Sequence, residues 1–267
     1  MTLSIGVDIG GTKIAAALVD ISTGAIHTST KVATPSSGNT QSVLDAICEV
    51  IASLEAPAGL PIGIGVCEFV DNARVIQSSY SVDLKHIDLG RELKGIGEIT
   101  IGSDVRAGAI AEFRFGAARG SASTFYVSAG TGISSCMLLN GVPITGAHGL
   151  AIVLGAPPVE ILASGRSLDH RRRDEKFSEN QFRDKIKEAG QKTGQAVATL
   201  ANALDPELIV IGGGLGISEP FFSSLADTVH LLTHEDVPSP YPVIPAELGT
   251  ESGVIGAALL TCDDPNA

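Results

Sequence analysis

The stretch Ile5-Gly-Val-Asp-Ile-Gly-Gly-Thr-Lys13 decides the fold class of this chain. Its branched apolar residues recur at every second position, which predicts a buried strand, and an apolar run over 14–19 predicts a second strand. Gly10 and Gly11 join the two runs, so the segment is predicted to be a β-hairpin. Adjacent glycines can adopt positive φ and let backbone N–H groups approach an anion closely.

The polar residues of this hairpin point to a phosphate site with a metal ion. Thr12 can donate a hydroxyl hydrogen bond, Lys13 carries a positive charge, and Asp8 would face Mg²⁺ through water. An ordinary Gly-Gly hairpin explains the glycines without a ligand, but it leaves Asp8 and Thr12 unexplained. The pattern is neither a Walker A loop nor a Gly-x-Gly-x-x-Gly dinucleotide turn.

Length and charge limit the classes of partner. With 267 residues the chain is long enough for two lobes that each bury a core. It has 18 Lys and Arg against 30 Asp and Glu, a net charge of −12, so we expect binding to neither nucleic acid nor an anionic membrane surface. A phosphate site must therefore be local, built from backbone N–H groups and a metal ion.

Cysteine usage and hydropathy suggest a cytoplasmic protein. The cysteines lack Cys-x-x-Cys spacing and lie mostly in apolar surroundings, which favours reduced core thiols. They are Cys48, Cys67, Cys136 and Cys262. The N-terminus has no basic segment followed by an apolar core, and no apolar stretch reaches about 18 residues, so we expect neither secretion nor membrane spanning.

The rest of the first half predicts an α/β order. Strands are expected over 25–32, 62–66 and 98–102, and a helix with apolar residues at helical spacing is expected around 43–51, after a loop over 35–39. Loop residues at the carboxyl ends of strands bind ligands in open α/β sheets. Ser103 and Asp104 follow the last of these strands and are therefore placed like site residues.

The second half repeats this scheme. A strand over 124–128, the turn Ala129-Gly-Thr-Gly132 and a strand over 133–139 predict another phosphate-sized hairpin, which suggests an internally duplicated fold. A helix over 179–204 and a strand over 208–211 follow, and then Gly212-Gly-Gly214, which suits either a flat ligand or a tight strand-to-helix turn. The remaining expectations are a solvated loop at 171–173 and a closing helix at 253–260.

Five segments in chain order form a recognisable set: the hairpin over 5–13, Ser103-Asp104, 129–132, 205–214 and 253–257. This set resembles the ROK family of sugar kinases over nearly the whole chain. The resemblance implies an α/β, two-lobed ribonuclease-H-like ATPase fold of the actin, hexokinase and Hsp70 type, with ATP between the lobes. We therefore expect an N-terminal lobe over 1–104, a C-terminal lobe over 105–252, and a C-terminal helix over 253–267 that returns to the first lobe.

The resemblance implies ATP and Mg²⁺ as cofactors. The two glycine hairpins would bracket the ATP phosphates, and the glycines at 212–214 would lie beside the adenosine. The implied cofactor-binding residues are Asp8, Gly10, Gly11, Thr12, Lys13, Gly130, Thr131, Gly132, Gly212, Gly213 and Gly214.

Asp104 matches the catalytic base of the family, which lies in an Asn-Asp-x-Asn motif. Here the segment reads Ser103-Asp-Val-Arg106, so the aspartate is kept and both asparagines are gone. Phosphoryl transfer to an alcohol needs one carboxylate that orients the hydroxyl and accepts its proton. The alternative role for Asp104 is the N-cap of a helix over 107–115.

The acceptor side departs further from the family. Gly146-Ala-His-Gly-Leu-Ala151 matches the run before the family's Gly-Glu-Ile-Gly-His segment, but Val153 and Ala156 replace its glutamate and histidine. The cysteine-rich zinc segment is replaced by Pro157-Pro158, so we expect no zinc. The candidate acceptor-side residues are Glu68, Ser103, Asp104, His148 and Glu160. A loop role for His148 and a solvent-facing helix position for Glu160 are the alternatives.

These features predict an ATP-dependent phosphotransferase that acts on a hydroxyl of a sugar-like molecule, and a modified sugar or a cyclitol is preferred over glucose because the acceptor contacts have changed. The family resemblance also implies a homodimer. Two alternatives stay open: a non-catalytic sugar-sensing protein, which in this family carries a DNA-binding domain ahead of the first strand, and an acyl-phosphate kinase, for which only Arg106 is placed to clamp a carboxylate.

Overall fold

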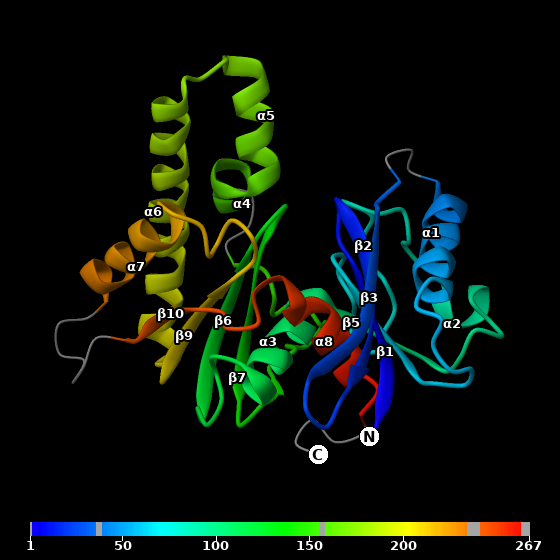
Figure 1. Cartoon of the computed structure of the whole chain (residues 1–267). Coiled ribbons are helices and arrows are strands. Elements are labelled where there is room, and N and C mark those ends of the chain that lie inside the picture. The colour runs from blue at the N-terminus through cyan, green and yellow to red at the C-terminus, as the bar shows by residue number, and fades with distance from the viewer. Residues whose placement is uncertain (1, 36–38, 155–157, 234–240, 263–267) are drawn as a thin grey trace. The chain divides into compact units, whose positions relative to one another are not determined.

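The computed structural model describes residues 2–35, 39–154, 158–233 and 241–262. It divides into two compact units (Figure 1). Unit 1 comprises Met1–Phe115, Gly141–Ala151 and Glu251–Ala267, and unit 2 comprises Gly116–Asn140 and Ile152–Thr250. Part of the loop expected over 35–39, the replacements Ala156 and Pro157, and the end of the helix expected to reach 267 lie outside the described residues.

Unit 1 is built on a five-stranded sheet in the order β3-β2-β1-β4-β5. Strands β1 to β3 are antiparallel neighbours, whereas β4 and β5 run parallel to β1. The strands are β1 (Leu3–Ile9), β2 (Lys13–Asp20), β3 (Ala25–Ala33), β4 (Ile62–Val66) and β5 (Ile99–Ser103). Because β1 and β4 are buried on both faces, they consist mainly of apolar residues and glycine, with Ser4 and Asp8 of β1 as the polar positions.

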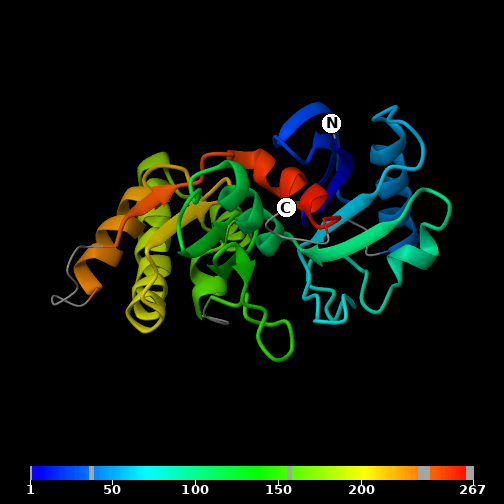
Figure 2. The ribbon, with the colours of Figure 1, turned by 90° about the horizontal axis from the view of Figure 1, so that it is seen from below.

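Four helices accompany this sheet: α1 (Thr40–Ala52), α2 (Leu89–Glu92), α3 (Asp104–Phe115) and α8 (Ser252–Leu259). The small residues of α8 let it lie directly on the sheet, since a Cβ at Gly6 or Gly63 would overlap the carbonyl oxygens of Val254 and Ala257. Figure 2 shows α8 in red beside the blue strand β1. Helix α3 packs against the other side of α8, where a Cβ at Gly256 would overlap the backbone of Ala107.

Unit 2 has a sheet in the order β10-β9-β6-β7, with β6 and β7 antiparallel and the other pairs parallel. Its strands are β6 (Ser123–Ala129), β7 (Ile133–Leu139), β9 (Leu208–Gly212) and β10 (Val243–Pro245); the two-residue β8 (Val142–Pro143) follows β7 in the chain. Its helices are α4 (Pro158–Ala163), α5 (Gly165–Glu175), α6 (Glu179–Leu204) and α7 (Phe221–Leu232), and the 3-10 helix Gly249–Glu251 precedes α8. Each unit thus repeats a glycine hairpin beside a parallel strand.

The long helix α6 follows from local sequence signals. Ser178 and Gln181 form a reciprocal capping box at its start, and Asp205 ends it in the left-handed conformation. The glycines Gly190 and Gly194 face α7 closely, because a Cβ at either position would meet α7 atoms. The predicted bounds of this helix are confirmed.

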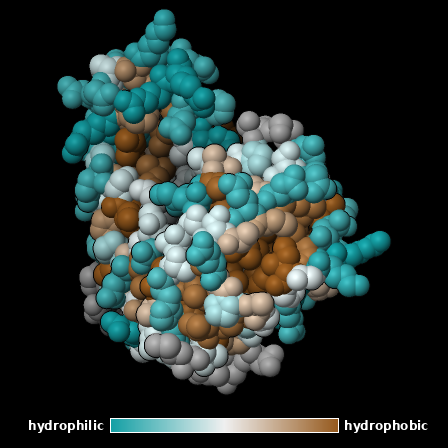
Figure 3. All heavy atoms as spheres, turned by 45° about the vertical axis from the view of Figure 1, so that its right-hand side comes forward, coloured by the Kyte–Doolittle hydropathy of each residue, from teal (hydrophilic) through white to brown (hydrophobic). Residues whose placement is uncertain are grey.

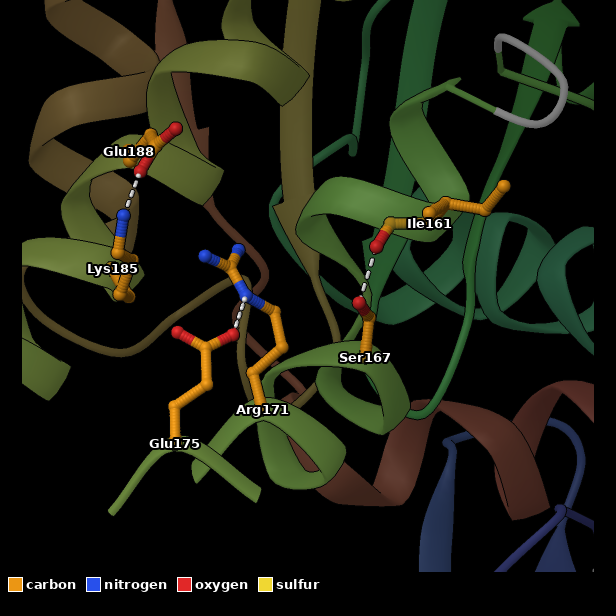
Figure 4. Close-up of polar contacts among 6 residues, drawn as sticks. All are labelled: Ile161, Ser167, Arg171, Glu175, Lys185 and Glu188. Carbon is orange, nitrogen blue, oxygen red and sulfur yellow. Dashed lines mark hydrogen bonds and ion pairs between the residues drawn. The ribbon is translucent and has the colours of Figure 1, made fainter. Parts of the chain in front are cut away.

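Two expectations about local structure are wrong. Residues 171–173 belong to α5 rather than to a loop, because the Ser164 side chain caps the start of this helix and Arg171 pairs with Glu175 one turn later at 3.4 Å. Arg172 also pairs with Glu179 of α6 at 2.6 Å. Figure 4 shows the Arg171 pair, and Figure 3 shows hydrophilic side chains at this end of unit 2. Helix α3 begins at Asp104 rather than at residue 107.

The units also differ from the expected lobes. We expected the first lobe to end at residue 104, but unit 1 continues to Phe115 and includes 141–151. The physical reason is the packing of α3 against α8, which keeps α3 with the first sheet. Among the described residues, no helix is both long enough and apolar enough to span a membrane.

Candidate active site

The parallel strands of unit 1 end in one row. Ile9 of β1 pairs with Val66 of β4, and Val66 pairs with Ser103 of β5. The residues that follow these three strands therefore lie at the same edge of the sheet, and Cys67 N continues the row by donating to Ile9 O at 3.0 Å. This is the edge at which open α/β sheets bind ligands.

Asp104 is the first residue of α3 at this edge. Burial raises its pKa from 3.8 to about 7, and the negative charges of Asp8 and Glu68 add to the effect. Its Oδ1 accepts a hydrogen bond of 2.6 Å from Val105 N. A capping side chain accepts from a residue two or three positions further on, so this contact is not that of an N-cap. A carboxylate with a pKa near neutrality suits a general base.

Asp8 lies one residue before the end of β1 and is partly exposed. Burial raises its pKa to about 6, whereas the charge of Lys13 lowers it. Its side chain accepts no hydrogen bond from any residue that the structure describes. The first turn of α8 approaches it closely, because a Cβ at Gly253 would lie 2.6 Å from Asp8 Oδ2. An aspartate with both oxygens available matches the oxygen ligands that Mg²⁺ prefers.

The turn after β1 is held by backbone contacts. Gly10 N donates to Lys13 O at 2.9 Å, and Thr34 binds the turn twice, to Gly10 O at 2.6 Å and to Thr12 O at 3.0 Å. The expectation of positive φ at Gly10 and Gly11 is wrong, since neither residue adopts it. Glycine at position 10 instead provides room, because a Cβ there would be 3.1 Å from Lys13 O. Thr12 and Lys13 are exposed.

The turn between β6 and β7 in unit 2 is braced by neighbouring helices. Gly130 N donates to Gly132 O at 2.8 Å, and Gly165 N, at the start of α5, donates to Gly130 O at 2.9 Å. Glu160 of α4 accepts a 2.8 Å hydrogen bond from Ile133 N. Glu160 therefore binds the hairpin backbone within unit 2, and the solvent-facing alternative is wrong.

The motif Gly212-Gly-Gly214 after β9 is expected to form either a tight turn or a surface for a flat ligand, and its glycines differ in this respect. Gly213 has φ +81, and a Cβ on it would overlap Ala129 O, while a Cβ on Gly212 would overlap the Tyr126 hydroxyl. The tight turn thus explains these two glycines. Gly214 is exposed, and nothing lies within 4 Å of where its Cβ would be. Steric crowding gives no reason for glycine at position 214.

Comparison with known proteins shows which family the chain belongs to. A family model described as "ROK family" matches residues 4–164 and 156–264. The chain belongs to the ROK family.

Three relatives illustrate the range of this family. The chain is 33% identical to the bifunctional enzyme NanE/NanK of Brucella melitensis over 94% of its own length, but it spans only 52% of that relative. It is 29% identical to the polyphosphate glucokinase of Mycobacterium tuberculosis, with 97% and 91% of the two chains covered. A ROK glucokinase from Streptomyces griseus, crystallised with glucose and AMPPNP, superposes with a TM-score of 0.81 at 27% identity over 97% and 98% of the chains. The two-domain ATPase fold of the actin and hexokinase type is confirmed.

In this ROK chain Glu68 departs from the role expected of it. Its carboxylate is 2% exposed, and all of its acceptor positions are used. Oε1 accepts from Ser81 N at 2.5 Å and from Val82 N at 2.9 Å; Oε2 accepts from Tyr80 N at 2.8 Å and from the Ser78 hydroxyl. A carboxylate has about four lone-pair positions, so Glu68 has none left for a sugar hydroxyl. The structure therefore gives no support to a direct contact between Glu68 and the acceptor.

The other acceptor-side residues also find definite places. The Ser103 side chain is fully buried at the end of β5, so in this conformation it is closed to a ligand. His148 is exposed in the segment 144–151, whose backbone accepts hydrogen bonds from Asn72 and from Arg106 Nη2, the latter at 2.5 Å to Gly149 O. Because the Arg106 guanidinium is buried against Gly149, the structure gives no support to a carboxylate clamp.

Two further residues of this part of unit 1, Cys67 and Tyr80, are not among the predicted site residues. Cys67 is expected to be a core thiol, yet it follows β4 in the row of strand ends, and burial followed by the charge of Asp104 raises its pKa well above the ordinary value. Tyr80 is 75% exposed on the segment that Glu68 holds. The position of Cys67 directly after a parallel strand was an available signal. Nothing in the local sequence marks Tyr80.

Metal-binding residues are sparse. In the described part of the chain, no group of three or more His, Cys, Asp or Glu is arranged to hold a metal ion. The expectation that the chain lacks zinc stays a prediction, in part because Ala156 and Pro157 lie outside the described residues. A magnesium ion that arrives with nucleotide phosphates needs only one or two protein carboxylates, so Asp8 is compatible with this role.

Proposed function

We propose that this ROK chain is an ATP-dependent phosphotransferase that transfers a phosphoryl group to a hydroxyl of a sugar-like small molecule. The observation that carries the proposal is the position of Asp104 in the row of strand ends, with its pKa raised to about 7 and the Asp8 carboxylate near enough to affect it. Titratable groups whose pKa is shifted by burial and by a specific charge are typical of catalytic sites.

In this proposal Asp104 orients the acceptor hydroxyl and accepts its proton as the oxygen attacks phosphorus. When its pKa is near the working pH, a base is deprotonated in a large fraction of the molecules. It still has enough proton affinity to take the proton from the acceptor hydroxyl. Arg106, two residues after Asp104, donates to Gly149 O and so holds that residue near the start of α3. Phosphoryl transfer then depends mainly on positioning and on electrostatic stabilisation of the transferred group.

The residues present fit Mg²⁺-ATP. Asp8 has both oxygens available, and the backbone turn at 10–12 has exposed polar groups at Thr12 and Lys13. Bound Mg²⁺-ATP supplies the phosphoryl group, and the cation neutralises part of its negative charge. In unit 2, the turn over 130–132 would contribute backbone groups to the phosphates, and Gly214 offers an uncrowded surface for the nucleoside.

For the acceptor we propose a modified sugar or a cyclitol in preference to glucose. Val153 stands where the family has a sugar-contacting glutamate, and the buried Glu68 and Ser103 have no hydrogen-bonding group open to a ligand. A pocket that loses polar partners no longer selects the hydroxyl pattern that those partners recognised. The glucokinases among the relatives make glucose the necessary comparison.

The test is a screen of ATP consumption against sugars, amino sugars and cyclitols with Mg²⁺ present, run in parallel on wild type and on Asp104→Asn. We expect turnover of at least one acceptor by the wild type and its loss in the variant. Saturable sugar binding without turnover would favour the non-catalytic sensor instead. Titration calorimetry that detects no saturable ATP binding would exclude the kinase function.

A further inference from the structure

The segment 78–82 of unit 1 is anchored on one buried carboxylate. Three consecutive backbone N–H groups, those of Tyr80, Ser81 and Val82, donate to Glu68, as does the Ser78 hydroxyl. The Ser78 oxygen also accepts a 2.9 Å hydrogen bond from Phe69 N. Among the described residues, Glu68 takes part in no salt bridge, so these four donors are what stabilise its charge.

This anchor holds an exposed aromatic side chain. Tyr80 is 75% exposed although its backbone N–H is bound to Glu68 at 2.8 Å. Its ring meets the Phe69 ring edge to face, with centroids 5.6 Å apart and planes at 76°. Edge-to-face contact is a preferred geometry for aromatic pairs. The ring is thus held by a neighbour on the same segment as the anchoring carboxylate, while most of its surface stays available.

The anchored segment lies close to the catalytic edge of the sheet. Glu68 is two residues beyond Val66, and Val66 pairs directly with Ser103, the neighbour of Asp104. The thiol of Cys67 interacts with the Ser81 side chain, and the negative charge of Asp104 raises the pKa of the same thiol. Cys67 therefore links segment 78–82 to the strand end that carries Asp104.

We propose that Glu68 is a positioning residue that fixes Tyr80 beside Asp104, so that the Tyr80 ring contacts the acceptor and contributes to its selection. This inference rests on the proposed phosphotransferase function. Tyr80 presents an apolar ring and a hydroxyl that can both donate and accept, a combination suited to a ring-shaped polyol with C–H and O–H groups. Glu68 acts only through the conformation of segment 78–82.

The test compares Glu68→Gln, Tyr80→Ala and the double variant, with Glu49→Gln on the exposed face of α1 as a matched control. The amide of glutamine keeps one acceptor oxygen and turns an NH₂ group toward backbone donors, so the anchor loses half of its capacity. We expect faster amide hydrogen exchange at Tyr80, Ser81 and Val82 in Glu68→Gln. Misplacing a contact should lower kcat/KM for the acceptor roughly 10- to 100-fold.

The kinetic pattern separates positioning from general destabilisation. In both single variants the loss should lie mainly in the acceptor KM, with the KM for ATP unchanged, because only acceptor binding is affected. The double variant should be no worse than the poorer single variant, since Glu68 acts through Tyr80. Glu68→Asp, which keeps the charge, should recover part of the loss, and Glu49→Gln should match the wild type.

Two results would overturn the inference, and they differ from failure of the proposed function. Wild-type acceptor KM in Tyr80→Ala, an exposed position at which folding is not at risk, would show that the ring does not contact the acceptor. Additive losses in the double variant would show that Glu68 acts independently of Tyr80. If the wild type itself phosphorylates no acceptor, the proposed function fails and this inference fails with it.

Discussion

The turn over 10–12 in unit 1 and the turn over 130–132 in unit 2 each close a glycine hairpin. Gly10 N donates to Lys13 O at 2.9 Å, and Gly130 N donates to Gly132 O at 2.8 Å. Each turn is also bound from outside, the first by Thr34 of the segment after β3 and the second by Gly165 of α5. A glycine N–H closes both turns, but Ile9 pairs with Ile14 across the first and Ala129 with Ile133 across the second, so the first loop is one residue longer.

The carboxylates beside the two turns differ. Glu160 in unit 2 accepts a hydrogen bond from Ile133 N, whereas Asp8 in unit 1 accepts none from the described residues and has its pKa raised to about 6. A carboxylate bound to backbone stabilises the fold, but a partly desolvated carboxylate without such donors weakens it. The difference is that the unit 2 turn is braced by a carboxylate, whereas the unit 1 carboxylate has no such hydrogen bond among the described residues and is the one we propose for chemistry.

The variant Asp104→Asn in unit 1 is the strongest test of the proposed difference between the two units. Loss of the base should lower kcat for the true acceptor roughly 10²- to 10⁴-fold, while ATP affinity and folding persist, because proton acceptance matters only in the transition state. Asp45→Asn on the exposed face of α1 is the control. A wild-type rate in Asp104→Asn would remove Asp104 from the catalytic assignment.

The next largest effect is expected for Asp8→Asn. Loss of a carboxylate that contacts Mg²⁺ through water should weaken Mg²⁺-dependent ATP binding roughly 10- to 100-fold. Calorimetric titration of ATP with and without Mg²⁺ measures this effect, and the variant should lose the difference between the two conditions. An unchanged Mg²⁺ dependence would mean that Asp8 does not serve the metal ion.

Glu160→Ala tests the structural half of the comparison. It leaves Ile133 N without its charged acceptor, so the free energy of unfolding should fall by about 1–3 kcal/mol. Glu160→Gln keeps an acceptor oxygen and should recover most of this loss. Glu179→Ala, which breaks only the exposed pair with Arg172, should cost about 0–1 kcal/mol.

Amide exchange at Ile133 localises the Glu160 effect to the hairpin. If Glu160→Ala instead abolished binding of the sugar-like substrate while stability stayed unchanged, Glu160 would be a ligand contact. The distinction between the two turns would then fail.

The pH dependence of stability tests the raised pKa values of the unit 1 carboxylates directly. In the unfolded chain Asp8 and Asp104 lose their protons near pH 3.8, but in the folded protein they keep them to about pH 6 and about pH 7. Between these values the folded state binds more protons, so stability should fall as pH rises from about 4 to about 7. One pKa unit corresponds to about 1.4 kcal/mol.

Urea unfolding of nucleotide-free protein in chelator, at pH 5 and pH 8, measures this dependence. Asp104→Asn should be less sensitive to pH than the wild type and should be the more stable of the two at pH 8. The carboxylates whose pKa is lowered, such as Asp20 and Asp71, act below about pH 4 and leave this window unaffected. Equal pH dependence in both proteins would contradict the raised pKa of Asp104.

Much of the fold and the family could be read from the sequence. The strand Ile62–Val66, the strand Ile133–Leu139 and the helix Glu179–Leu204 have the predicted bounds. Their signals are local, namely apolar runs, helical spacing and capping residues within the same window. The ROK resemblance is confirmed because it depends on the order of several motifs along the chain.

The roles of individual carboxylates could be predicted less well. Glu68 and Glu160 were reasonable candidates for the acceptor by position, but each is bound to a backbone segment that is distant in sequence. Glu160 accepts from Ile133, 27 positions earlier, and Glu68 accepts from Val82, 14 positions later. No local pattern reveals that those N–H groups need an acceptor.

The sequence by itself determined the two glycine hairpins, the α/β order, the family and the place of Asp104 after a strand. Only the tertiary structure decided which carboxylates remain available for chemistry, how Glu68 anchors the segment around Tyr80, and that α3 belongs with unit 1. The physical reason is that periodicity and turn chemistry act between near neighbours in the chain. Desolvation, shifted pKa values and the satisfaction of buried donors depend on atoms that only folding brings together.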